Sequence, residues 1–227
     1  MLLLELFSGT GVISKEARVR GFETLEVDFD KRSNANLIQD ILKWDYKEYF
    51  NTHQKPDFVW ASPDCRSWSL APGVIHRSIA DMKPKTEVAK LGNLMIYKTI
   101  EIINYLKPKV VFIENPRGRL RHFEPMKTEF YKDIRRFTIY YSNHGHIIRK
   151  PTDIWTNIPI MKDYFNDEKF IPREGLETFK QIKSIRKTLN GKYDKNSKLM
   201  TIREQRHTIP QGVCKYIFDG LINHLEI

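Results

Sequence analysis

Residues 2–11, LLLELFSGTG, decide the fold. The first six are mostly apolar, which is typical of a buried β-strand, and the last four require a tight turn. Apolar residues at helical spacing follow over 12–20, and Gly21 is a suitable end for that helix. A strand, a glycine-rich turn and a helix are the opening unit of a doubly wound α/β fold, in which the glycines let a ligand approach the backbone.

The alternation of strands and helices continues along the chain. Apolar and β-branched runs predict further strands at 22–27, 37–41, 58–61, 110–113, 137–142 and 153–156. The spacing over 87–106 predicts the clearest helix, and a shorter one is expected near 125–135; the core face of the first comprises Val88, Leu91, Met95, Ile102 and Leu106. We therefore predict an α/β, Rossmann-like, doubly wound fold with a mostly parallel seven-stranded sheet and a small basic appendage.

Composition divides the chain into three segments. Its 227 residues, 41% of them hydrophobic, suit one large domain, which we place at 1–157 as a catalytic core. Residues 158–200 are expected to form a small basic segment, because the stretch 169–206 holds 11 Lys or Arg residues against 4 Asp or Glu. Residues 201–227 should contain a final helix whose apolar face packs back on the sheet.

Charge and cysteine content narrow the class of protein. The net charge of +10 favours a polyanionic partner, although a merely soluble basic protein has the same composition. Two cysteines provide neither a disulfide framework nor a four-ligand zinc set, so we expect no metal and a reducing, intracellular compartment. Met1–Leu4 is too short for a signal peptide, and no apolar run approaches membrane length, so no membrane association is expected.

Cys65 is the first candidate for chemistry. It lies in ASPDCRSWS, residues 61–69, on a polar loop directly after the apolar run 57–60. Pro63 stiffens the backbone beside it, which suits a nucleophile, whereas a buried structural cysteine is the alternative.

Other polar residues and glycines follow other predicted strands. Ligands of doubly wound folds bind outside the carboxyl ends of the strands, so these residues should share one site with Cys65. They are the Gly9 and Gly11 turn after the first strand, Asp28 after the second, Asp40 near the third, and Glu114 with Asn115 after the fifth.

A cysteine and a glutamate at one site fit the methylation of carbon 5 of cytosine. This carbon is a weak nucleophile until a thiolate adds to carbon 6 of the ring. A carboxyl group near ring N3, for which Glu114 is the candidate, would supply a proton, and Arg149 or Lys150 could steady O2 or a phosphate. A base inside a duplex cannot be reached in this way and must be flipped out.

These residues resemble the motifs of the DNA cytosine-5 methyltransferases. Residues 5–11 look like the family's first motif, and 62–69 are similar to its Pro-x-Cys-x-x-Phe-Ser loop. Residues 114–116 look like its Glu-Asn-Val, and Arg206-x-x-Ile209-Pro210 is similar to its terminal motif. The resemblance covers 2–157 and about 200–227, and it implies S-adenosyl-L-methionine as cofactor and double-stranded DNA as partner of a monomeric enzyme.

The resemblance also implies roles for individual residues. It implies cofactor contacts from Phe7, Ser8, Gly9, Thr10, Gly11, Asp28, Phe29, Asp40, Ile41 and Pro63. It implies catalytic roles for Cys65, Glu114 and Arg149. It implies DNA contacts from Arg66, Ser69, Arg117, Lys150, Lys183, Arg186 and Lys187.

The chain departs from the family pattern in several places. Asp64 stands where most members have a second proline before the cysteine, Pro116 replaces valine, and the family's Gln-x-Arg-x-Arg is replaced by a region around Arg149. The target-recognition region is reduced to about 40 residues, so the chain looks like the small forms of large DNA viruses and phages. Fewer base contacts predict a short target and an affinity dominated by phosphate contacts.

Three alternatives remain open at this stage. A methyltransferase acting on an exocyclic amino group would need an aromatic residue at the position of Cys65, which the sequence lacks. An RNA cytosine-5 methyltransferase would share every motif. A catalytically inactive DNA-binding relative is the third, because a carboxylate at Asp64 should raise the pKa of the Cys65 thiol and slow its attack.

Overall fold

The computed structural model describes residues 1–70, 75–144, 146, 150–158 and 209–225. Seven strands form one sheet in the order β3-β2-β1-β4-β5-β7-β6. All neighbouring pairs are parallel except those of β7, which runs antiparallel to both β5 and β6. The strands are β1 Leu2–Leu6, β2 Glu23–Asp28, β3 Leu37–Ile38, β4 Phe58–Ala61, β5 Val110–Pro116, β6 Arg135–Tyr140 and β7 Pro151–Thr156. The predicted mostly parallel seven-stranded α/β sheet is therefore confirmed.

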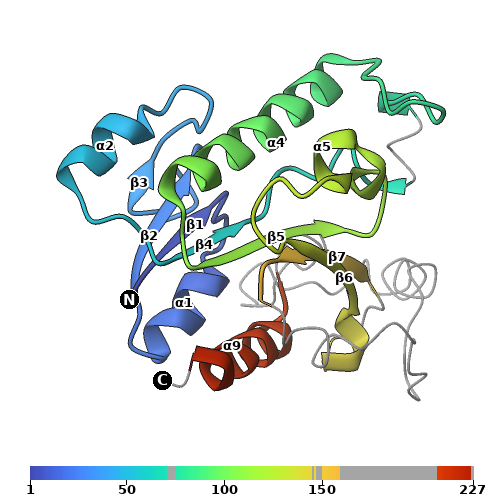
Figure 1. The fold of residues 1–227 in the computed structure, drawn as a ribbon. Helices are drawn as coiled ribbons and strands as arrows, with labels where there is room; N and C mark the ends of the chain where they lie inside the picture. The colour runs from blue at the N-terminus through green and yellow to red at the C-terminus, as the bar shows by residue number, and fades with distance from the viewer. Residues whose placement is uncertain (71–74, 145, 147–149, 159–208, 226–227) are drawn as a thin grey trace, which may run out of the picture.

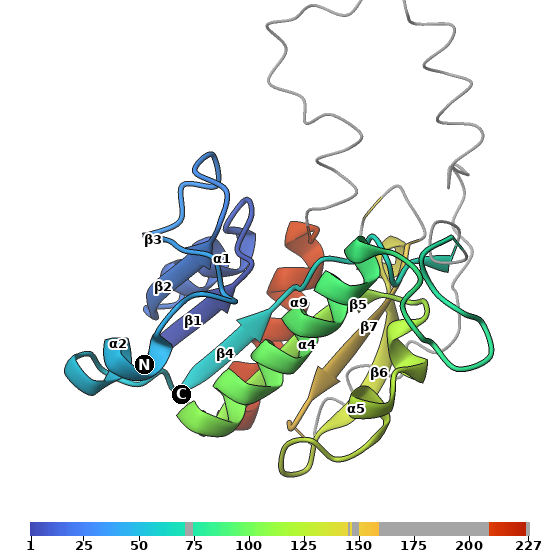
Figure 2. The same ribbon diagram turned by 90° about the horizontal axis from the view of Figure 1, so that it is seen from above.

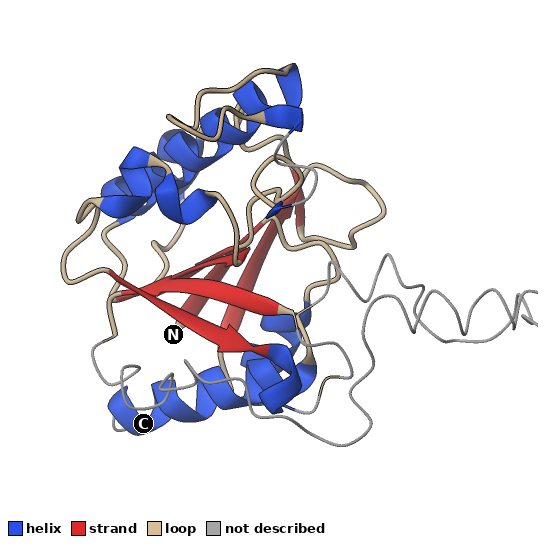
Figure 3. Ribbon diagram, turned by 90° about the vertical axis from the view of Figure 1, so that its right-hand side faces the viewer, coloured by secondary structure: helices blue, strands red, loops and turns tan. Residues whose placement is uncertain are grey.

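Helices cover both faces of the sheet, so the core has two layers (Figures 1 and 3). On one face lie α1 Val12–Val19 and α9 Gln211–Leu225, and on the other lie α2 Tyr46–Thr52, α4 Glu87–Leu106 and α5 Glu124–Lys127. Successive strand residues serve opposite faces: Leu3 packs with α1 and α9, whereas Leu4 packs with α2 and α4. Figure 2 shows α4 running over β4 and β5.

Several elements differ in extent from the sequence prediction. Strand β5 continues past its apolar run to Pro116, because β7 pairs with it as far as Pro116 and opposes Glu114 with Ile154. Strand β3 ends at Ile38, and Asp40 begins a turn in which its carboxylate accepts a hydrogen bond from the backbone of Leu42 at 3.0 Å. The helix expected near 125–135 is only the four-residue α5.

The structure describes the predicted C-terminal helix but not most of the basic segment before it. Helix α9 shares a core cluster with α1 through Val213, Ile217, Phe218 and Leu221. Residues 159–208 lie outside the described residues, and with them lies almost all of the expected basic segment 158–200.

Candidate active site

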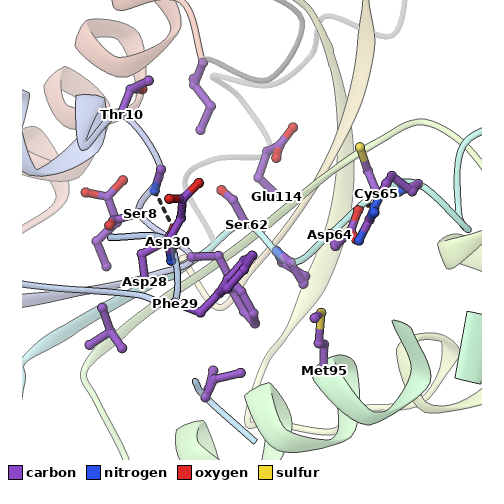
Figure 4. Close-up of a pocket in the computed structure, with 18 of the residues that line it drawn as sticks. Ser8, Thr10, Asp28, Phe29, Asp30, Ser62, Asp64, Cys65, Met95 and Glu114 are labelled. Atoms are coloured by element: carbon purple, nitrogen blue, oxygen red, sulfur yellow. Dashed lines mark hydrogen bonds and ion pairs between the residues drawn. The ribbon is translucent and has the colours of Figure 1, made fainter. Parts of the chain in front are cut away.

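One pocket of about 580 Å³ lies at the carboxyl ends of the parallel strands. The turn after β1, the ends of β2 and β5, and the loops after β3 and β4 contribute to its wall. Figure 4 shows Ser8, Thr10 and Asp28 at one end of this pocket, with Cys65 and Glu114 further along it. The convergence of these residues on one sheet edge follows from the parallel topology.

The glycine turn is held by an acidic side chain of the neighbouring strand. Gly9 and Gly11 have φ angles of +52° and +62°, which only glycine adopts without strain. The backbone N–H of Gly9 donates to Asp28 Oδ2 at 2.8 Å, and that of Asp30 donates to Asp28 Oδ1 at 2.8 Å. Phe7 also has a positive φ of 59°, which is unusual for a bulky residue and is a strained conformation of the kind that clusters at functional sites.

Nine of the ten residues expected to contact the cofactor line the pocket: Phe7, Ser8, Gly9, Thr10, Asp28, Phe29, Asp40, Ile41 and Pro63. Gly11 does not line it and instead precedes α1 as its N-cap residue. The Phe29 ring is 71% exposed in this pocket, and the buried Ser8 hydroxyl has no hydrogen-bond partner within the described chain.

Glu5, Leu91 and Met95 also line the pocket, although sequence analysis did not assign them to it. Leu91 is 38% exposed, so the expectation that the whole 87–106 stripe is core is wrong for its first turns. Burial raises the pKa of Glu5 to about 7, and its carboxylate accepts the backbone N–H of Ser14 at 2.9 Å. In the sequence, Leu91 looks like an ordinary member of an apolar helix stripe, and Glu5 looks like an ordinary residue near the end of a strand.

The Cys65 loop is folded by its own backbone. The Cys65 carbonyl accepts from the backbone N–H groups of Trp68 and Ser69, at 3.1 and 2.9 Å, and from the Ser69 hydroxyl at 2.9 Å. Asn115, one residue after Glu114, donates through Nδ2 to the Pro63 carbonyl at 2.9 Å, so β5 fixes the start of the loop. Ser69, which we expected to contact DNA, therefore has its hydroxyl bound within the loop.

The environment of Cys65 disfavours its thiolate in the free protein. Burial raises the pKa of the thiol, the Glu114 carboxylate raises it further, and Lys150 lowers it. Asp64 contributes a smaller rise. The Asp64 carboxylate is also paired with Arg66, whose Nε and Nη2 both lie 2.6 Å from Oδ2. The residue that departs from the family pattern is thus partly neutralised by its own neighbour.

Glu114 is buried and accepts a hydrogen bond from the Tyr141 hydroxyl at 3.1 Å. Burial raises the pKa of Glu114, while Lys150 and the Tyr141 hydrogen bond lower it. A carboxyl group in such surroundings can hold a proton at a pH where an exposed glutamate cannot.

Of the remaining residues expected to act in catalysis or DNA binding, some lie in the described part of the chain and the others lie outside it. Arg66 and Lys150 line the pocket, whereas Arg117 does not and donates to the Tyr140 hydroxyl at 3.3 Å. The other expected residues lie outside the described part of the chain: Arg149, Lys183, Arg186 and Lys187.

Arg77, in a stretch of sequence with little periodicity, is fully buried. Its guanidinium lies 3.2 Å from the centre of the Trp68 ring and makes five hydrogen bonds. The acceptors are the carbonyl and hydroxyl of Ser67, the carbonyls of Met82 and Ala89, and Oδ1 of Asn93. Arg77 therefore ties the Cys65 loop to α4, and every donor of its guanidinium is used internally.

The close approach of α4 to this loop explains a glycine in the middle of the helix. A Cβ at Gly92 would lie 2.7 Å from the Ser67 hydroxyl and 3.2 Å from Arg77 Nη2. Both distances are shorter than ordinary contacts, so glycine is needed where the helix meets the Arg77 side chain.

We expect Arg77→Met to lower the free energy of unfolding by about 3 kcal/mol, and the unfolding temperature by about 6 to 12 °C, because buried acceptors lose their donors. Thermal unfolding followed by circular dichroism measures the change. The matched control is Lys90→Met on α4, where an exposed lysine is paired only with exposed Glu87 and a change within about 0.5 kcal/mol is expected. Equal unfolding temperatures for the two variants would contradict the role given to Arg77.

The described part of the chain holds no group of three or more His, Cys, Asp or Glu residues able to bind a metal ion. None of the helices in the described ranges is long and apolar enough to cross a membrane.

A glycine turn, an acidic strand end and a cysteine loop on this sheet define a Rossmann-like methyltransferase. No protein-family model matches the sequence. A protein of Frog virus 3 (isolate Goorha), named "Probable DNA (cytosine-5)-methyltransferase", is 32% identical over 177 residues, which are 76% of this chain and 74% of that protein. The chain belongs to the DNA (cytosine-5)-methyltransferase family, as its motifs predicted.

Solved structures share the fold. The methyltransferase EhMeth of Entamoeba histolytica matches with a TM-score of 0.53 at 14% identity, over 78% of this chain and 57% of its own. Dnmt2 of S. pombe matches with a TM-score of 0.51 at 13% identity, over the same shares of the two chains. A protein of an E. coli prophage, described as a DNA modification methyltransferase, gives 0.51 at 15%, over 69% of this chain and 46% of its own. This chain spans about half the length of those proteins, and at such identities they establish the fold alone.

Proposed function

We propose that this protein transfers a methyl group from S-adenosyl-L-methionine to carbon 5 of cytosine in DNA, through a covalent bond between Cys65 and a flipped-out base. The observation that carries the proposal is the shared pocket. A buried carboxyl group and a cysteine line the same pocket as the glycine turn and the acidic strand end (Figure 4).

The pocket residues fit the proposed cofactor. Asp28 can accept hydrogen bonds from ribose hydroxyls while it holds Gly9, because each carboxylate oxygen accepts more than one. The exposed Phe29 ring offers a face for stacking, and the unpaired Ser8 hydroxyl offers a polar contact. When bound, the cofactor supplies an electrophilic methyl group.

Cys65 and Glu114 would act together on the cytosine ring. The Cys65 thiolate forms a bond to carbon 6 while Glu114 gives its proton to N3, so that carbon 5 becomes nucleophilic. After carbon 5 has accepted the methyl group, a base removes the proton from carbon 5 and N3 returns its proton to Glu114. The bond between sulfur and carbon 6 then breaks, and the thiolate is released.

The electrostatics of Cys65 and Glu114 support the roles of nucleophile and general acid that we propose for them. An ionised Glu114 raises the pKa of Cys65, so the protonated form of Glu114 both donates to the ring and favours the thiolate. Lys150 lines the pocket, lowers the pKa of both groups and lies in the region where the sequence offered Arg149 or Lys150.

A substrate comparison tests the proposal. We expect labelled methyl groups to appear on duplex DNA, and not on the same duplex synthesised with 5-methylcytosine in place of cytosine. Transfer to the fully methylated duplex would point to an exocyclic amino group instead. Transfer to tRNA in the absence of transfer to DNA would overturn the choice of DNA as substrate.

A further inference from the structure

Tyr141 is a buried tyrosine that is hydrogen-bonded to the pocket residue Glu114 and that no sequence motif singles out. It begins the 3-10 helix η2, Tyr141–His144, directly after β6, and its side chain is 0% exposed. Its hydroxyl donates to Glu114 Oε1 at 3.1 Å. In the sequence it lies in a run predicted to be strand, where a tyrosine indicates only a buried or half-buried position.

The position of Tyr141 is fixed from two sides. Its backbone N–H lies 3.4 Å from the Lys150 carbonyl, and its carbonyl accepts from the backbone of His146 at 3.1 Å. The ammonium of Lys150 lies 4.7 Å from the centre of the Tyr141 ring, a distance typical of a cation–π contact. The tyrosine thus has its ring beside the cation and its hydroxyl on the carboxyl group.

We infer that Tyr141 is a positioning residue for Glu114, an inference that rests on the proposed function. Because Oε1 accepts the tyrosine hydroxyl, the proton of a neutral Glu114 resides on the other carboxyl oxygen. That leaves one defined donor for cytosine N3. Without the hydroxyl, the proton can occupy either oxygen and the carboxyl group can rotate, so fewer encounters have the productive geometry.

The hydrogen bond also influences the titration of Glu114. Lys150 and Tyr141 lower the pKa of Glu114, burial raises it, and Asp153 on β7 adds to the rise. On the loop after β4, Cys65 is coupled to Glu114, because the Glu114 carboxylate raises the pKa of the thiol. Removal of the tyrosine hydroxyl therefore raises the pKa of Glu114. Since a carboxyl group normally titrates far below a thiol, Glu114 accounts for the lower of the two pKa values in a kcat/KM profile.

Tyr141→Phe tests the inference, because it removes the hydroxyl and keeps the buried ring. We expect kcat to fall about 10- to 100-fold while KM for DNA and cofactor stays within about twofold, as expected for lost orientation. The lower pKa of the kcat/KM profile should move to higher pH. In a Glu114→Gln background the substitution should cost much less than in the wild type, because the two residues act as one unit.

Tyr131→Phe is the matched control, since the Tyr131 hydroxyl also donates to an oxygen, the Pro108 carbonyl at 2.6 Å, but Pro108, unlike Glu114, does not line the pocket. Its kcat and pH profile should be unchanged. An unchanged kcat in Tyr141→Phe, or a loss of activity that only follows a loss of folded protein, would overturn the inference.

A second readout does not depend on methyl transfer. At neutral pH, a higher Glu114 pKa leaves more neutral carboxyl next to Cys65, so iodoacetamide should alkylate Cys65 faster in Tyr141→Phe than in the wild type. Mass spectrometry of the Cys65 peptide measures the rate. Faster alkylation in a protein that transfers no methyl group would contradict the proposed function and leave the Tyr141–Glu114 coupling standing. Equal alkylation rates would contradict the coupling itself.

Discussion

Cys65→Ala is expected to reduce methyl transfer to DNA by about 10⁴-fold or more, because the thiolate that activates carbon 5 is lost and no other group can replace it. The loop should keep its fold, since the backbone carbonyl of Cys65, which alanine retains, accepts three of the hydrogen bonds that fold it. Binding of S-adenosyl-L-methionine, measured by calorimetry, should therefore remain within a few-fold of the wild type. Initial rates with labelled cofactor measure the loss of transfer.

Cys214→Ala is the control for this prediction. Cys214 is the other cysteine of the chain, is buried among core residues on α9 and does not line the pocket. Its loss should cost some stability and leave the rate nearly unchanged. Substantial transfer in Cys65→Ala, or equal losses in the two variants, would exclude the covalent mechanism.

Glu114→Gln is expected to lower kcat by about 10²- to 10⁴-fold, the usual contribution of a positioned general acid. Glutamine has the same shape and can still accept the Tyr141 hydroxyl, so the fold and the pocket should be retained. The amide cannot give a proton to N3 or take it back. Steady-state kinetics should show the loss in kcat with little change in KM.

The same substitution should increase the reactivity of the Cys65 thiol, although it lowers kcat. The carboxylate that raises the pKa of the thiol is gone, so alkylation of Cys65 at neutral pH should be faster in Glu114→Gln. Glu124→Gln, a change of an exposed glutamate on α5, should alter neither quantity. A Glu114→Gln variant with wild-type kcat would remove the glutamate from the mechanism.

Sequence patterns predicted those parts of the site that depend on local structure. The glycine turn, Asp28 and the Cys65 loop each follow a short apolar strand, and parallel strands bring their carboxyl ends together without further information. The Asp64–Arg66 pair is equally local, two residues apart, and its presence weakens the expectation of an inactive relative.

Tertiary contacts determined what sequence patterns did not predict. An arginine in an irregular segment is usually solvated, and nothing local shows that Arg77 finds five acceptors on three different segments. Tyr141 follows β6, and Glu114 lies on β5 with β7 between the two strands, so their hydrogen bond depends on the order of strands in the sheet. Leu91 and Met95 belong to a helical stripe whose first turns pass beyond the core and reach the pocket.

The most direct test of the account is a duplex oligonucleotide with 5-fluorocytosine at the target position, incubated with the protein and S-adenosyl-L-methionine. After methyl transfer, fluorine cannot leave carbon 5 as a proton does, so the sulfur–carbon bond cannot break. We predict a protein–DNA adduct that survives denaturing electrophoresis and whose mass places the base on the peptide containing Cys65. A wild-type protein that methylates ordinary DNA but forms no such adduct would contradict the covalent role of Cys65.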